Sequence, residues 1–98
     1  MGSYIISERA KKDIIGIWDY TVREWSEEQA ERYFNSLLDT CERIASSPEN
    51  SGRDYEYVCP HLRGISCGRH IIFFRFISRN KVRIIRIMYE RMDFPRHF

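Results

Sequence analysis

The chain has 98 residues, which is enough for one compact domain around a single core and too few for a multidomain enzyme. Its 16 basic residues barely outnumber its 14 acidic residues, and this balance excludes the strong basic excess of a dedicated nucleic-acid binder. No apolar run reaches the roughly 18 residues of a membrane helix, and no secretory signal precedes the first elements. The sequence therefore predicts a single domain, residues 1–98, in a cytoplasmic protein that binds no membrane.

The first elements in chain order are a short strand and a helix. Residues 4–6 are prone to form a strand and are followed by Ser7, a favoured N-cap residue. Apolar side chains then recur at helical spacing from Ala10 to Trp18, so we expect one face of this helix to be buried. Trp25, which precedes the next helix start, is expected to pack against that second helix.

A second helix is predicted from Ser26 to about Ser46. The sequence Ser26-Glu27-Glu28-Gln29 has the form of a capping box, in which Gln29 bonds back to the Ser26 backbone. Pro48 prevents the helix from extending much further. Two amphipathic helices with so short a joint are expected to pair as a hairpin.

The second half of the chain predicts a run of strands. The composition of residues 48–54 is typical of a loop, and strands are then expected at 55–58, 62–66, 70–77 and 81–89. Strands that follow a pair of helices indicate an α+β protein with an antiparallel meander, and the helical hairpin should cover one face of this sheet.

The three cysteines, Cys41, Cys59 and Cys67, form neither a CxxC pair nor a zinc-ligand pattern. We therefore expect reduced thiols. No nucleotide-binding or metal-binding motif is present, so we expect no metal and no cofactor.

Two arginines lie within the last two apolar strands. If residues 78–81 close the hairpin, Arg75 faces Ile84 and Phe73 faces Arg86. Strict alternation then places Arg75 and Arg86 on the face away from the helices, whereas His70 and Tyr89 lie on the helix face. The arginines are candidates for a binding site, or they pair with carboxylates such as Glu56, Glu90 and Asp93 and hold the fold together.

Several motifs, in order and at matching spacing, resemble one known family. They are "YIIS", "IWDYT", "QAERYFNSLLDTCERIASSP", "GR" at residues 52–53, "LRG" at residues 62–64, "GRHIIFFR" and "VRIIRIMYERMD". Together they resemble the ParE toxins of the RelE/ParE superfamily of bacterial toxin–antitoxin modules. The resemblance implies the element order β-α-α-β-β-β.

The resemblance also implies a function and partners. ParE-like toxins inhibit DNA gyrase without being enzymes, and a ParD-like antitoxin neutralises them by direct binding. Operator DNA would be reached only indirectly, through the antitoxin. The candidate gyrase-binding residues are Arg75, Arg86, Arg91, Met92, Asp93, Arg96, His97 and Phe98. The candidate antitoxin-binding residues are Ile14, Trp18, Tyr33, Leu37, Arg63 and Phe73.

Two alternatives stay open. One is a ribosome-dependent mRNA endoribonuclease of RelE type, because Tyr89 stands where the ParE pattern often has histidine and a tyrosine near the C-terminus is typical of those nucleases. The predicted register argues against it, since a base at His70 and a cation at Arg86 would lie on opposite faces of the sheet. The other alternative is an inactive relative that only binds an antitoxin.

Overall fold

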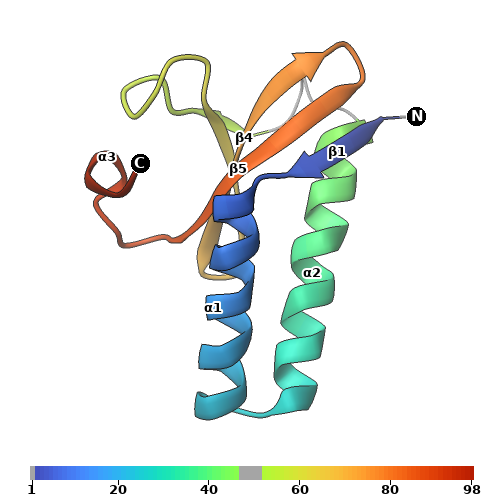
Figure 1. Ribbon diagram of the computed structural model, residues 1–98, viewed down its shortest axis with the longest axis vertical. Coiled ribbons are helices and arrows are strands. Elements are labelled where there is room, and N and C mark those ends of the chain that lie inside the picture. The colour runs from blue at the N-terminus through green and yellow to red at the C-terminus, as the bar shows by residue number, and fades with distance from the viewer. Residues whose placement is uncertain (1, 47–51) are drawn as a thin grey trace.

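A helical hairpin lies on one face of a five-stranded sheet (Figure 1). The computed structural model describes residues 2–46 and 52–98. The strand order across the sheet is β1-β5-β4-β3-β2. The elements are β1 (Ser3–Ile6), α1 (Glu8–Glu24), α2 (Glu27–Ser46), β2 (Arg53–Asp54), β3 (Arg63–Cys67), β4 (His70–Ser78), β5 (Lys81–Tyr89) and α3 (Phe94–His97).

The α+β class and the helical hairpin are confirmed, with two corrections. The sheet is mixed, because β1 runs parallel to β5 while the other pairs are antiparallel. Residues 55–58 form turns instead of a strand, and the strand that pairs with β3 is the short β2. Residues 48–51 of the expected loop at 48–54 lie outside the described residues, and Arg53–Asp54 of that range form β2. Within the described part, no helix is both long and apolar enough to cross a bilayer.

The N-caps explain where both long helices begin. The Ser7 hydroxyl accepts a hydrogen bond from the Ala10 N–H at 3.0 Å and donates one to the Ile85 carbonyl at 2.8 Å, so it ties α1 to the middle of β5. The Ser26 hydroxyl accepts from the Gln29 N–H at 3.0 Å. The reciprocal half of the capping box is replaced, because the Ser26 N–H donates to the Thr21 carbonyl instead.

A β-bulge at Ile85 makes the predicted register wrong over the outer half of the β4–β5 hairpin. His70 pairs with Tyr89 and Phe73 with Arg86, as predicted, but Arg75 pairs with Arg83 and not with Ile84. The extra residue on β5 shifts the three pairs from Phe74 to Phe76 by one position, and a second irregularity at Ile77 restores the predicted register where Ser78 pairs with Lys81. Val82 and Ile84 consequently face the helices, whereas Ile85 faces the opposite side of the sheet.

Each face of the sheet therefore carries its own core. The larger core lies between the sheet and the helices and includes Phe74, Ile44 and Cys41. Burial, together with the nearby Cys67, raises the pKa of the Cys41 thiol to about 12, and all three cysteines are free thiols. The smaller core, called here the tail cluster, covers the other face and combines buried Leu62, Ile71, Phe73 and Met88 with partly buried Tyr55, Val58, Cys59, Ile85, Met92, Phe94 and Phe98.

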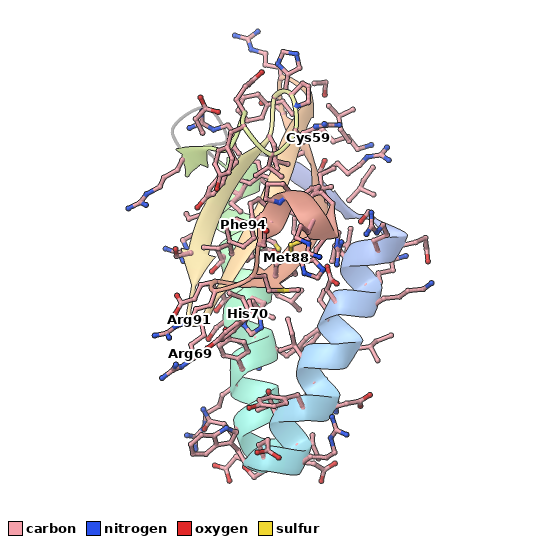
Figure 2. All side chains as sticks on the ribbon, turned by 90° about the vertical axis from the view of Figure 1, so that its left-hand side faces the viewer. Cys59, Arg69, His70, Met88, Arg91 and Phe94 are labelled. Carbon is pink, nitrogen blue, oxygen red and sulfur yellow. The ribbon has the colours of Figure 1, made fainter. Side chains whose placement is uncertain are left out.

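Aromatic contacts attach the C-terminal residues to this second face. The ring of Phe73 lies 5.0 Å from that of Phe94 and 5.1 Å from that of Phe98, both edge to face. Such pairs are favourable beyond the area they bury. The short helix α3 consequently lies over the sheet, on the side away from the helical hairpin, with Phe94 near Met88 (Figure 2).

Candidate functional site

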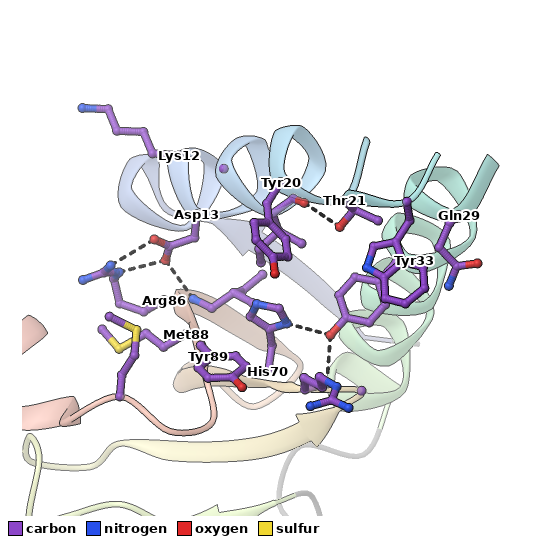
Figure 3. A pocket seen from close by; sticks show the side chains of 17 residues that line it. Lys12, Asp13, Tyr20, Thr21, Gln29, Tyr33, His70, Arg86, Met88 and Tyr89 are labelled. Carbon is purple, nitrogen blue, oxygen red and sulfur yellow. Dashed lines mark hydrogen bonds and ion pairs between the residues drawn. The ribbon is translucent and has the colours of Figure 1, made fainter. Parts of the chain in front are cut away.

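A groove of about 1040 Å³ opens between the helical hairpin and the inner end of the β4–β5 hairpin (Figure 3). We call it the hairpin groove. Its wall combines exposed aromatic side chains, aliphatic side chains and several cations. The lining residues are Lys12, Asp13, Gly16, Ile17, Tyr20, Thr21, Trp25, Gln29, Tyr33, Gly68, Arg69, His70, Arg86, Ile87, Met88, Tyr89 and Met92.

Tyr33 organises one end of the groove. Its hydroxyl lies 2.6 Å from His70 Nδ1, accepts a hydrogen bond from the Arg69 N–H at 3.0 Å and lies 3.0 Å from the Cys67 carbonyl, to which it can donate. Gly68 completes the turn with φ of 58°, and a Cβ there would come within 2.5 Å of the Tyr33 ring. The turn between β3 and β4 is thus fastened to α2 by one hydroxyl group.

The surroundings of His70 favour its neutral form. Burial lowers its pKa from the ordinary value, although Glu90 and Asp13 act in the opposite direction. When His70 is neutral, its Nδ1 can accept a hydrogen bond from the Tyr33 hydroxyl. When Nδ1 is protonated, it would donate a hydrogen bond to the Tyr33 oxygen, and the Tyr33 hydroxyl would then donate to the Cys67 carbonyl. The groove wall can therefore satisfy either protonation state of His70, at a cost to stability for the charged one.

The lowered pKa of His70 predicts a pH dependence of stability. The unfolded chain binds a proton on His70 more readily than the folded chain does. The contribution of His70 to the free energy of unfolding is therefore complete above the ordinary histidine pKa, and it is lost as the pH falls from there toward the lower pKa of the folded state. We expect His70→Asn to have a smaller decrease in melting temperature than the wild type between pH 7.5 and 5.5. Thermal scans by circular dichroism measure this, and His61→Asn, at an exposed loop position, is the matched control. Parallel pH profiles for the wild type and His70→Asn would contradict the assignment.

An ion pair between Asp13 and Arg86 forms the other end of the groove. Arg86 Nε and Nη2 donate to the two Asp13 carboxylate oxygens at 2.8 and 2.9 Å, and the Ile87 N–H donates to the same carboxylate at 2.9 Å. β1 pairs with β5 only as far as Ile84, so the edge of β5 beyond that residue is open to α1. Asp13 therefore replaces a strand neighbour there, and its hydrogen bonds raise the pKa of Arg86.

Arg86 also holds the C-terminal residues in place. Its Nη1 donates to the His97 carbonyl at 2.5 Å, and Arg9 from α1 donates to the same carbonyl at 3.1 Å. One guanidinium thus joins α1, β5 and the tail. Arg86 was predicted to contribute to target binding; the structure pairs its side chain with Asp13 and not with Glu56, Glu90 or Asp93.

The other predicted gyrase-binding residues divide by exposure. Arg75 donates to Cys59 Sγ and lies partly buried beneath the loop before β3. Met92 and Phe98 are partly buried in the tail cluster. The exposed members of the set, which are available to a partner, are Arg91, Asp93, Arg96 and His97.

The predicted antitoxin-binding residues are mostly placed in or beside the core. Leu37 and Phe73 are 1% and 0% exposed, so neither reaches a surface in this conformation. Ile14 packs against the larger core and Trp18 meets Phe34 edge to face, while Arg63 is partly buried and donates to the Gly52 carbonyl. Tyr33 is the member of this set that lines the hairpin groove.

The groove brings together His70 and Arg86, which the predicted register had placed on opposite faces of the sheet. Both residues and Tyr89 line it, because Arg86 bends around the open edge of β5 toward Asp13. The proximity does not assemble a nuclease site, since Arg86 is bound bidentately by Asp13 and His70 Nδ1 is engaged by Tyr33. A general base and a phosphate-binding cation would both have to be released first.

Three residues of the groove were not recognised from the sequence. Trp25 is 74% exposed, so it does not pack against the second helix as expected, and Tyr20 is 58% exposed. Asp13 lies on the polar side of a helical pattern and gave no signal of its partner, which is 73 residues away in the chain. Exposed Tyr20 and Trp25 would indicate a binding surface, but their exposure can be recognised only once the packing of the two helices is known.

Comparison with solved structures identifies the class of fold. A chain described as "Chromosomal ParDE TA system from P. aeruginosa" superimposes with a TM-score of 0.77, covering 91% of this chain and 95% of that one at 20% sequence identity. The helical hairpin on a five-stranded sheet is therefore a fold found in toxin–antitoxin systems.

The family follows from the sequence itself. Residues 4–94 match the model of the ParE toxin of the type II toxin–antitoxin system parDE, and the chain belongs to this family. Toxin ParE1 of Caulobacter vibrioides is 36% identical over 97 residues, covering 99% of this chain and 98% of that protein. Toxin ParE1 of Mycobacterium tuberculosis H37Rv is 32% identical over 94 residues, covering 96% and 95%, and Toxin ParE of Escherichia coli is 33% identical over 93 residues, covering 95% and 89%. The family predicted from the sequence motifs is confirmed.

Proposed function

We propose that this protein is a cytoplasmic toxin that poisons DNA gyrase and thereby blocks replication. The observation that carries the proposal is the family match over residues 4–94. The exposed cations Arg91 and Arg96 on the C-terminal residues supply a surface suited to a target protein bound to DNA. The toxin would act by holding its target and not by catalysis, because the His70 and Arg86 side chains are already engaged within the chain.

Expression in bacteria without an antitoxin tests this proposal. We expect thymidine incorporation to stop before methionine incorporation, since gyrase poisoning arrests replication first. The RelE-type alternative predicts the opposite order, with cleaved mRNA and an early arrest of translation. Normal growth at a verified level of folded protein would indicate an inactive relative and contradict the proposal.

We further propose that a ParD-like antitoxin occupies the hairpin groove. Lys12 and Arg69 give the groove a positive charge, because Asp13 and Arg86 neutralise each other. Tyr20 and Trp25 provide apolar surface in solvent. A positive groove with exposed aromatic side chains fits an acidic, amphipathic segment that becomes ordered as it binds.

The substitution Trp25→Ser tests the groove. A large aromatic side chain in an interface is often a hot spot, so we expect an approximately 30-fold weaker antitoxin complex, equivalent to about 2 kcal/mol. Isothermal titration calorimetry with the candidate antitoxin measures the affinity. Tyr57→Ser is the matched control, because Tyr57 is 70% exposed and lies outside the groove. Equal affinities for the wild type and Trp25→Ser would place the antitoxin elsewhere.

A further inference from the structure

Positive charge is concentrated in the β4–β5 hairpin. Residues 70–89 contain Arg75, Arg79, Lys81, Arg83 and Arg86 and no carboxylate, so they carry a charge of +5 in a chain whose net charge is +2. The rest of the chain is accordingly negative. The small net charge conceals a strong asymmetry, which is a recognised sign of contact with a polyanion.

Most of this charge is not neutralised within the chain. Asp13 pairs with Arg86, but no ion pair involves the other four cations among residues 2–46 and 52–98. Arg79 and Arg83 are exposed and Lys81 is partly exposed. Arg75, Arg79, Lys81 and Arg83 all belong to the outer half of the hairpin, beyond the bulge.

The bulge at Ile85 places two of these cations directly opposite each other. Arg75 on β4 is the cross-strand partner of Arg83 on β5, and like charges in that position oppose strand pairing. Arg75 Nε is also buried without a hydrogen-bond partner in the described structure. The buried Nε is out of reach of an external anion, but an anion beside the exposed Arg83 would relieve the repulsion of the like-charge pair.

We propose that the outer end of the β4–β5 hairpin binds the phosphate backbone of duplex DNA. Arginine guanidinium groups bind phosphate oxygens in bidentate fashion. Because β1 lies beside β5 over residues 81–84, the sheet end would contact the phosphates from outside the grooves. Phe76 and Ile77, at 47% and 44% exposed, provide apolar contacts beside the cations at this end. Arginine predominance and the absence of carboxylates favour a phosphate backbone over an acidic protein.

The position of the hairpin leaves the groove accessible at the same time. The β4–β5 turn lies at the opposite end of the molecule from the α1–α2 connection (Figure 1). The hairpin groove is lined by α1, by Trp25 of that connection, by the first turns of α2 and by the inner ends of the two strands. DNA on the outer hairpin therefore does not compete with a segment in the groove. The contact is independent of gyrase and would not read sequence.

Fluorescence anisotropy with a 20-base-pair duplex of arbitrary sequence tests the proposal. We expect a Kd on the order of 10 µM near 0.1 M salt and a slope of about −3 for log K against log salt, as for three phosphate contacts. The double variant Arg79→Gln/Arg83→Gln is expected to reduce the slope by about 2 and to weaken binding by about tenfold or more.

Charge-matched variants distinguish DNA binding at the outer hairpin from a general effect of the net charge of the protein. Arg23→Gln/Arg32→Gln removes the same charge from exposed positions on α1 and α2 and is expected to bind DNA like the wild type. Arg83→Lys should retain binding. Arg83→Gln should melt no lower than the wild type, because it removes the like-charge pair, so its weaker binding cannot be ascribed to unfolding.

Three outcomes would overturn the proposal. The first is no binding at 0.05 M salt and about 100 µM protein. The second is an equal loss of binding in Arg23→Gln/Arg32→Gln. The third is competition by polyglutamate or single-stranded RNA that is as effective as unlabelled duplex, since this would identify an acidic protein or RNA as the ligand.

Discussion

Replacing Arg86 with alanine is expected to lower the free energy of unfolding by about 2 kcal/mol and the melting temperature by about 10 °C. The Asp13 and Arg86 side chains are 15% and 13% exposed, so the alanine variant leaves a nearly buried carboxylate that keeps only the Ile87 N–H as a hydrogen-bond donor among the described residues. The His97 carbonyl also loses one of its two arginine donors. The cost is therefore larger than for an ordinary surface ion pair.

Thermal denaturation of a double-mutant cycle measures this effect. Asp13→Asn, Arg86→Ala and the double variant should show a coupling well above that of the exposed pair Glu28 and Arg32, for which Arg32→Ala should cost less than about 0.5 kcal/mol. Hydrogen exchange at the Arg96 amide, which donates to the Asp93 carbonyl, should accelerate in Arg86→Ala. A melting temperature within about 2 °C of the wild-type value would show that Arg86 holds neither α1 nor the tail.

Removal of the charges on the C-terminal residues is expected to reduce gyrase inhibition by at least about tenfold, equivalent to about 1.4 kcal/mol. The double variant Arg91→Gln/Arg96→Gln is suited to this test, because both side chains are exposed while Phe94 and Phe98 keep their contacts with Phe73. The fold should remain intact, as near-ultraviolet circular dichroism can verify. The concentration of toxin needed for half-inhibition of supercoiling gives the effect.

Truncation after Asp93 provides a harsher version of the same test. It removes α3 and exposes Phe73, so we expect both lower stability and loss of toxicity. Arg23→Gln/Arg32→Gln removes as much charge as Arg91→Gln/Arg96→Gln, from exposed positions on α1 and α2, so it is the control for that double variant and should remain fully inhibitory. A truncated protein that folds and keeps full toxicity would exclude the C-terminal residues from target binding.

Local signals explain why the helices could be predicted. The caps at Ser7 and Ser26 act within one turn of the chain, and the apolar spacing of each helix is visible without knowledge of its neighbours. The strands β4 and β5 were also recognisable from their composition. Residues 55–58 were misassigned because aromatic side chains favour strands, yet here Tyr55 contributes to the tail cluster from a turn.

Contacts that depend on three-dimensional arrangement could not be predicted. The bulge at Ile85, together with the irregularity at Ile77, places Arg75 opposite Arg83, although the turn alone favoured Ile84. The pair of Asp13 and Arg86 requires an edge of β5 left open where β1 ends, which no periodicity reveals. The family, by contrast, was recognisable because its motifs extend along nearly the whole chain. The groove required the structure, because Trp25 and Tyr20 are typical core residues by type.

We propose that the free toxin traps gyrase on cleaved DNA and that an antitoxin segment in the hairpin groove prevents this trapping. Incubation of purified gyrase, plasmid and this protein, with and without an equimolar ParD-like antitoxin, tests it directly. We predict that linear, covalently trapped plasmid accumulates only when the antitoxin is absent, and that Trp25→Ser restores trapping in its presence. Unchanged DNA topology at saturating folded toxin, together with cleavage of translating mRNA, would contradict the claim and establish the nuclease instead.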